Sequence, residues 1–203
     1  MATDRRLCFE DVYAEFHPRI RRYLDRLLGA SEAEEATQEV FVKVSQALAR
    51  FRGESSVSTW IYRVATNVAY DRLRSSSLRR TGEVPIDSET HAKDPSPGIE
   101  RQLVRREMND CVDRFIDRLP ANYRSVVILS EQEGLTNHEI AKALRLTVDT
   151  VKIRLHRART RLKRELGDGC NFYRDERNEL ACDPKPNVVF LRRRPPSTGS
   201  TSR

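Results

Sequence analysis

The 203-residue sequence lacks any apolar run approaching the ~20 residues that a membrane-spanning helix needs. Its first residues, MATDRRLCFEDVYAEF, contain no apolar secretion segment. We therefore expect a cytoplasmic protein with no membrane insertion. The four cysteines form no C-x-x-C pair, and the four histidines have no partners at metal-ligand spacing. The sequence thus predicts neither a zinc ribbon nor a disulfide scaffold, and no metal or other cofactor.

The usual sequence patterns of catalytic sites are missing as well. There is no glycine-rich phosphate loop, no pair of carboxylates in a pocket-like context and no nucleophile–base pair. We therefore predict that the chain is not an enzyme.

The chain is instead rich in charge. Charged residues make up 33% of it and hydrophobic residues 38%, and the net charge is +7. Its length suggests one or two domains, and its apolar content suffices for small helical cores. The excess of positive charge indicates a polyanionic partner.

Residues 134–165, GLTNHEIAKALRLTVDTVKIRLHRARTRLKRE, have the pattern of two helices joined by a tight turn. Thr136 and Glu139 fit a capping box at the start of the first helix, and Thr147 can cap the second. The apolar residues of the second helix recur at helical spacing: Val151, Leu155, Ala158 and Leu162.

The faces between these apolar residues are almost all cationic, with no acid between Thr150 and Arg164. A cationic second helix is typical of a helix-turn-helix, whose second helix enters the major groove with its N-terminal half. Positive side chains favour this approach because each neutralised phosphate releases a counterion. The alternative is a solvated surface helix, although such helices usually mix the two signs.

The first 75 residues predict three helices, over about 9–28, 31–51 and 60–74. The second begins with an acidic outward side, which either compensates the helix dipole or docks a basic partner. The third has an apolar face opposite a face of mixed chemistry, made of Trp60, Arg63, Asn67, Tyr70, Asp71 and Arg74. That face could hold unpaired bases, or its two aromatic rings could pack against a neighbouring helix.

Proline, glycine and serine dominate residues 75–97, which predicts a flexible linker. A helix over about 99–119, ended by Pro120, and a short helix over 122–133 precede the helix-turn-helix. We therefore expect an all-α fold of two small helical domains, residues 1–75 and 99–168, joined by a linker over 76–98. The second is a four-helix domain, and the Arg- and Pro-rich tail over 169–203 is expected to be largely irregular.

Cys170 and Cys182 lie twelve residues apart in this tail. They could form a regulatory disulfide, and so a redox switch, or contribute thiolates to a shared metal site. The alternative is a pair of inert thiols.

Three stretches, in this order, resemble the extracytoplasmic-function (ECF) sigma factors of the main bacterial sigma family. They are AEEATQEVFVKV (33–44), STWIYRVATNVAYDRLR (58–74) and RLPANYRSVVILSEQEGLTNHEIAKALRLTVDTVKIRLHRARTRLK (118–163). The resemblance covers roughly residues 9–166. It implies a subunit that directs core RNA polymerase to promoters, and an anti-sigma factor that blocks it.

The resemblance also implies roles for particular residues. Glu35, Gln38, Glu39 and Phe41 match the family's polymerase-docking helix, which binds the clamp helices, and the flap is a second polymerase contact. The pattern around Trp60, Arg63 and Asn67 matches the region that melts the minus-ten element, where Asn67, Tyr70, Asp71 and Arg74 would face the non-template strand. Trp60 and Arg63 would serve strand contact or local packing.

The second helix of the helix-turn-helix would read the minus-thirty-five element. The residues expected there are Thr147, Asp149, Thr150, Lys152, Ile153, Arg154, His156 and Arg157. Asp149 and Ile153 depart from the family's V-G-T-V-K-S-R pattern. Asp149 could repel phosphate or accept from a cytosine amine, and Ile153 could pack inward or touch a thymine methyl.

The second hypothesis is a one-component regulator that binds duplex DNA without polymerase and senses a ligand with its N-terminal helices. Nothing in residues 1–75 indicates a ligand pocket.

Overall fold

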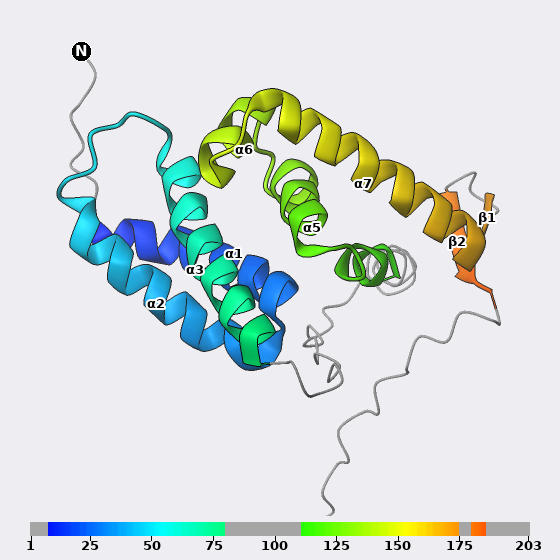
Figure 1. The fold of residues 1–203 in the computed structure, drawn as a ribbon, viewed down its shortest axis with the longest axis horizontal. Coiled ribbons are helices and arrows are strands. Elements are labelled where there is room, and N and C mark those ends of the chain that lie inside the picture. Colours follow the sequence, from blue (N-terminus) through cyan, green and yellow to red (C-terminus); the bar gives the residue numbers. More distant parts are fainter. Residues whose placement is uncertain (1–7, 80–110, 175–179, 186–203) are drawn as a thin grey trace, which may run out of the picture.

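The computed structural model describes residues 8–79, 111–174 and 180–185. Residues 80–98 of the predicted linker lie outside the described residues, and residues 76–79 belong to a helix. The all-α prediction is confirmed, and the described helices form two groups that lie side by side (Figure 1).

The first group contains α1 (Phe9–Leu28), α2 (Ala30–Leu48) and α3 (Val57–Arg79). Gly29 joins α1 to α2 at a φ of 91°, a conformation that glycine adopts without a steric penalty. The helices pack around fully buried rings and aliphatic side chains, among them Ile20, Leu24 and Val40. The Tyr23 hydroxyl hydrogen-bonds the Thr66 hydroxyl at 2.8 Å, and the Tyr23 and Tyr62 rings meet edge to face.

Helix α3 is longer at both ends than its sequence pattern suggests. It begins at Val57 because Ser56, and neither Ser58 nor Thr59, accepts the Thr59 backbone N–H as its cap. It continues to Arg79 through three serines that are weak helix formers. Ser75 and Ser76 donate their hydroxyls to the carbonyls of Arg72 and Leu73, which satisfies these groups within the helix.

The second group contains a helical segment over 111–117, then α5 (Ala121–Val127), α6 (Asn137–Leu144) and α7 (Val148–Gly169). A π-helical turn, η1 (Ile128–Gln132), follows α5 directly. In it the Glu133 backbone N–H donates to the carbonyl five residues earlier, on Ile128, at 3.1 Å. The second group therefore departs from regular α-helix just before the helix-turn-helix.

The tail over 169–203, predicted to be largely irregular, contains a β-hairpin in its first part, which the sequence did not predict. Strands β1 (Cys170–Arg174) and β2 (Leu180–Pro184) form an antiparallel hairpin at the end of α7. Cys170 pairs with Pro184, and Phe172 with Cys182. The Lys185 backbone N–H donates to the Gly169 carbonyl at 2.8 Å, which ties the hairpin to the end of α7.

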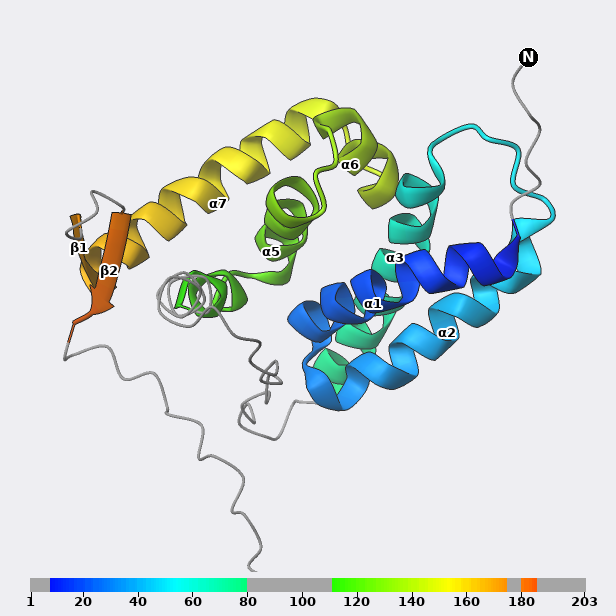
Figure 2. The same ribbon diagram turned by 180° about the vertical axis from the view of Figure 1, so that it is seen from behind.

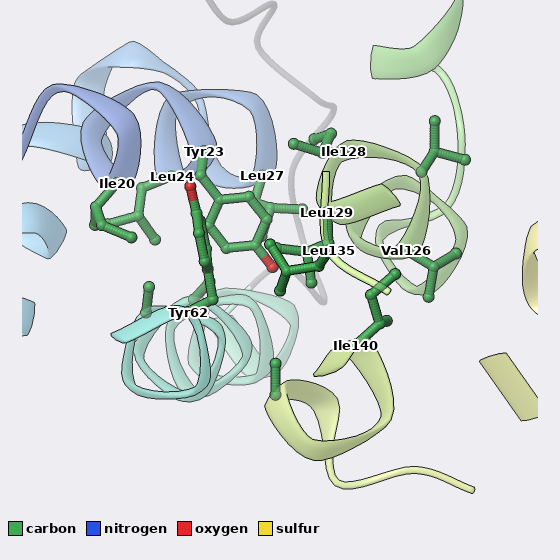
Figure 3. Close-up of a cluster of buried hydrophobic side chains, with 14 of the residues drawn as sticks. Ile20, Tyr23, Leu24, Leu27, Tyr62, Val126, Ile128, Leu129, Leu135 and Ile140 are labelled. Atoms are coloured by element: carbon green, nitrogen blue, oxygen red, sulfur yellow. The ribbon is translucent and has the colours of Figure 1, made fainter. Parts of the chain in front are cut away.

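The two groups share one buried apolar cluster (Figure 3). Ile20, Tyr23 and Leu24 of α1 contribute to it together with Tyr62 of α3. Leu129, Leu135 and Ile140 come from the second group. Seen from behind, α1 lies across α3, and α5 and α6 lie beside this bundle (Figure 2). The groups are therefore packed against each other through apolar side chains.

Polar contacts surround this interface, and Arg26 of α1 makes the densest set. Its guanidinium bonds Asp117 at 2.7 Å and Asp113 at 2.8 Å, and its side chain is only 6% exposed. Arg124 of α5 donates to the Arg26 carbonyl at 2.6 Å. Burial raises the pKa of Asp117, and the Arg26 charge acts in the opposite direction.

Candidate nucleic-acid interface

The turn between α6 and α7 has the geometry of a helix-turn-helix. Thr136 and Glu139 form the predicted capping box: the Glu139 N–H donates to the Thr136 hydroxyl, and the Thr136 N–H donates to the Glu139 carboxylate. Arg145 ends α6 in the left-handed conformation at φ 53°. Thr147 then caps α7 by accepting from the Thr150 N–H at 3.2 Å. Both predicted N-caps are confirmed.

Helix α7 has one buried face and one exposed face. The predicted apolar stripe of Val151, Leu155, Ala158 and Leu162 is buried. The exposed face carries the predicted groove residues Asp149, Lys152, Ile153, His156 and Arg157, whereas Thr150 and Arg154 are half-buried and Thr147 is exposed at the cap. Ile153 is 52% exposed, so it points outward and does not pack into the core.

The exposed face of α7 also carries an ion pair and a shallow depression. Asp149 lies 3.8 Å from Lys152, which partly neutralises the acid near the N-terminus of α7. A shallow depression further along the helix is lined by Asn137 of α6 and by Lys152, His156, Arg159 and Lys163 of α7. Leu155 and Thr160 complete its lining, and Arg159 is paired with Glu131 at 2.5 Å, so Lys152 and Lys163 are the cations there that suit a phosphate.

The six predicted site residues on α3 fall into two sets: four are exposed to solvent, and two contact other parts of the protein. Arg63, Asn67, Asp71 and Arg74 are exposed. Trp60 is half-buried, and its ring lies 5.1 Å from the Phe51 ring, which matches the packing interpretation for this residue.

Tyr70 contacts the other group of helices. Its hydroxyl hydrogen-bonds the Ser125 hydroxyl of α5 at 2.9 Å. In this arrangement Tyr70 is therefore held at the interface between the two groups.

The acidic side of α2 is partly neutralised by a residue of α3. Arg72 lies 3.3 Å from Glu35 and 3.0 Å from Glu39. Burial lowers the pKa of Arg72, but its hydrogen bonds to the two carboxylates outweigh this effect and the pKa is raised. Gln38 is exposed beside them.

Phe41, the fourth residue expected on this surface, is 4% exposed. Its ring packs against Tyr13 and His17 of α1, at centroid distances of 4.8 and 5.6 Å. The next residue, Val42, is 55% exposed. Phe41 thus fixes the position of α2 on α1, and Val42 and the acids form the accessible surface.

The two tail cysteines lie close together, and a third cysteine joins them. The Sγ atoms of Cys111, Cys170 and Cys182 lie within 4.8 Å of one another. Burial, and next the Cys111 thiol, raise the pKa of Cys170 to about 12. Burial also raises the pKa of Cys182.

Sequence reasoning missed Arg72, Ser125, Val42 and the role of Cys111. No spacing rule connects Arg72 with Glu35, or Ser125 with Tyr70, because the partners lie far apart in the chain. Cys111 lies beside an apolar stripe and looks like a small core residue. The exposure of Val42 could have been predicted, because helical periodicity places this apolar residue on the outward side of the helix.

This architecture defines a helical, DNA-binding class of protein, with a cationic helix-turn-helix packed beside a second helical group. Two family models match the chain: Sigma-70 region 2 over residues 12–79 and Sigma-70, region 4 over residues 109–162. The chain belongs to the ECF group of the sigma-70 family and is an RNA polymerase sigma factor.

The relatives support this assignment. The RNA polymerase sigma-H factor of Pseudomonas aeruginosa is 33% identical over 166 residues, which cover 72% of this chain and 83% of the relative. The ECF RNA polymerase sigma factor SigW of Bacillus subtilis is 30% identical over 171 residues, covering 79% and 89%. The fold is also similar to that of the sigma factor RpoE of Bartonella quintana, with a TM-score of 0.63 and 22% identity, covering 78% of this chain and 96% of that one.

The prediction of a sigma factor is thereby confirmed, and the one-component regulator is not favoured. Within the described residues, no helix is both long and apolar enough to cross a membrane.

Proposed function

We propose that this sigma factor binds core RNA polymerase and places its two helical groups on two promoter elements, helping to open the duplex between them. The observation that carries the proposal is the division of α7 into a buried apolar face and an exposed face with Lys152, Ile153 and Arg157. Because one face of α7 packs against the rest of the protein, the opposite face is free to enter a major groove.

On α7, the proposal assigns reading of the minus-thirty-five element to the first half. The residues on or beside the exposed face there are Thr147, Asp149, Thr150, Lys152, Ile153, Arg154, His156 and Arg157. Arginine makes bidentate contacts to guanine, and the exposed Ile153 suits a thymine methyl. The later exposed cations, such as Lys163 and Arg164, suit phosphate contacts that carry no sequence information.

On α3, the exposed side chains of Arg63, Asn67, Asp71 and Arg74 suit contact with the non-template strand of the minus-ten element. Tyr70 belongs to the same helix face, but its hydroxyl is bonded to Ser125. We infer that Tyr70 reaches the strand only after the two groups separate, and that Trp60 supports the face by packing on Phe51.

On α2, Glu35, Gln38 and Glu39 offer a charged, accessible surface for the polymerase clamp helices, with Val42 as an apolar contact and Phe41 as support. The flap is the second polymerase contact in this proposal. An anti-sigma factor is a further proposed partner, because the similar Bartonella fold is that of a sigma factor solved with the anti-sigma factor NepR. We propose no catalytic activity and a cytoplasmic location.

In vitro transcription tests the proposal. Core RNA polymerase is supplied with this protein and genomic fragments, and start sites are mapped. We expect new start sites that neither component produces alone. Footprints on duplex DNA with no new start sites would contradict it.

Substitutions in α7 test the groove assignment. Arg157→Ala and Arg154→Ala should each weaken promoter binding by ~1–3 kcal/mol if a bidentate base contact is lost. Arg164→Ala, an exposed residue near the end of α7, is the matched control, and we expect a smaller loss that is equal on promoter and unrelated DNA. Unchanged promoter affinity for both Arg154 and Arg157 variants would count against the assignment.

A further inference from the structure

The three clustered cysteines come from three separate elements. Cys111 lies at the start of the described helical segment over 111–117, Cys170 follows α7 as the first residue of β1, and Cys182 lies in β2. Cys170 is 3% exposed, and the other two are half-buried. Folding thus brings Cys111 next to Cys170, which lies 59 residues further along the sequence.

The hairpin register explains how two of the thiols meet. Cys170 pairs with Pro184 and Phe172 pairs with Cys182, so Cys170 and Cys182 are diagonal neighbours. Because side chains alternate between the faces of a strand, both cysteines lie on one face. Cys111 completes the group from the helical segment, with its Sγ 3.8 Å from that of Cys170.

The sulfur spacing suits a shared metal ion. Sulfur ligands bind zinc at about 2.3 Å, so three of them around one ion lie about 3.8–4.0 Å apart in a tetrahedral or trigonal arrangement. The observed Sγ atoms are 3.8 Å apart in one pair and within 4.8 Å overall. Only small side-chain movements separate this cluster from a coordination sphere.

The hairpin itself gives an independent reason for a ligand. Two five-residue strands make a unit that is marginally stable on its own in water. Phe172 and Tyr173 are about half exposed, so they contribute little to a hairpin core. An ion bound to Cys111, Cys170 and Cys182 would fasten both strands to the helical segment and to the end of α7.

We propose that Cys111, Cys170 and Cys182 form a binding site for one thiophilic metal ion, zinc(II) or copper(I). Thiolates favour these soft ions over magnesium or calcium. Within the described residues the cluster offers three ligands and no fourth. Copper(I) is satisfied by three sulfurs, whereas zinc(II) would take a water as its fourth ligand. Each thiol that binds as thiolate releases one proton to solvent.

Metal titration of the reduced, full-length protein tests the site. Cobalt(II), as a coloured substitute for zinc(II), is titrated in one series, and copper(I), held by a competing chelator, in the other. We expect one ion per chain in at least one series, with the charge-transfer absorption of metal-bound thiolate. The series that saturates identifies the class of ion. Failure of both ions to bind at one per chain would overturn the proposal.

Serine substitutions identify the ligands. Cys111→Ser, Cys170→Ser and Cys182→Ser should each weaken binding at least tenfold. Cys8→Ser is the matched control, since Cys8 is exposed and lies outside the cluster, and it should bind as the wild type does. Full affinity in the Cys111 variant, or an equal loss in the Cys8 variant, would overturn the three-thiol site.

Alkylation of the wild type avoids any folding defect in these variants. The protein is treated with a thiol reagent with and without the metal, and labelling is mapped by mass spectrometry. We expect the metal to slow labelling of Cys111 and Cys182 but not of Cys8. Equal labelling rates with and without metal would contradict the site.

Discussion

At the start of α6, the Glu139 carboxylate accepts hydrogen bonds from Thr136 and places a negative charge near the N-terminus of the helix. Hydrogen bonds from the Thr136 backbone N–H, and next from its hydroxyl, lower the pKa of Glu139 below its usual 4.5. A lowered pKa in the folded state means that the ionised carboxylate stabilises the fold above about pH 4.5. This contribution is lost as the pH falls through the lowered value.

Glu139→Gln isolates this charge, because glutamine keeps an acceptor oxygen but no charge. We expect the variant to be less stable by about 0.3–1 kcal/mol at pH 7, a modest figure because the site is largely solvated. The difference should be smaller at pH 3.5, which lies below the usual pKa of 4.5. Thermal unfolding at both pH values measures it, with the exposed Glu54→Gln as control. A difference that is constant with pH would contradict the assignment.

At the scale of one element, the buried face of α7 stabilises the fold, and the opposite face is the one proposed to contact DNA. Leu155 is 4% exposed, and truncation to alanine should cost about 2–5 kcal/mol of stability. Ile153, two residues away, is 52% exposed, so Ile153→Ala should leave stability within about 0.5 kcal/mol.

Ile153→Ala should instead change promoter preference, most strongly where a thymine stands in the minus-thirty-five element. Denaturant unfolding of both variants, with binding to promoter variants, separates the two roles. A large stability loss in the Ile153 variant would show that this side chain packs inward in solution.

The helices could be predicted from the sequence because their determinants are local. The capping pair Thr136–Glu139, the cap at Thr147 and the apolar stripe of α7 all lie within a few residues of the backbone that they fix. The hairpin was not predicted, because its strands are short and pair through a register that only the folded chain defines. The predicted start of α3 was also wrong, by a few residues. Ser56, Ser58 and Thr59 all carry a hydroxyl that could cap the helix, and the sequence does not show which of them does so.

At the scale of the whole molecule, the packing of the two helical groups could not be predicted. Its contacts join distant positions: Arg26 and Asp117 lie 91 residues apart, and Arg19 bonds Glu133 across 114 residues. No periodicity encodes such pairs. For the candidate site, the exposure of the charged faces of α2, α3 and α7 could be predicted from helical periodicity, but the burial of Phe41 and the hydrogen bond of Tyr70 could not.

The Arg26 contacts predict how the groups separate. In an Asp113→Asn, Asp117→Asn double variant, Arg26 keeps its burial but loses both charged partners. A buried charge without a partner is costly, so we expect the variant to favour an open arrangement in which Arg26 meets solvent. Small-angle X-ray scattering should show a larger radius of gyration with unchanged helix content.

Glu34→Gln is the control, because it breaks the exposed Arg21–Glu34 pair within the first group. That variant should scatter as the wild type does. An unchanged radius in the double variant would mean that the apolar cluster alone holds the groups together.

The π-helical turn η1 has a consequence for how the recognition helix is aimed. Each α-helical residue rotates the chain by about 100°, and a π turn holds one residue more than an α turn. Removing one residue between Ile128 and Gln132 would restore a regular helix and leave every groove-facing side chain chemically intact. Those side chains would then point in another direction relative to α1. Under the proposed function, the direction in which α7 meets DNA would therefore depend partly on the number of residues in this one turn of backbone.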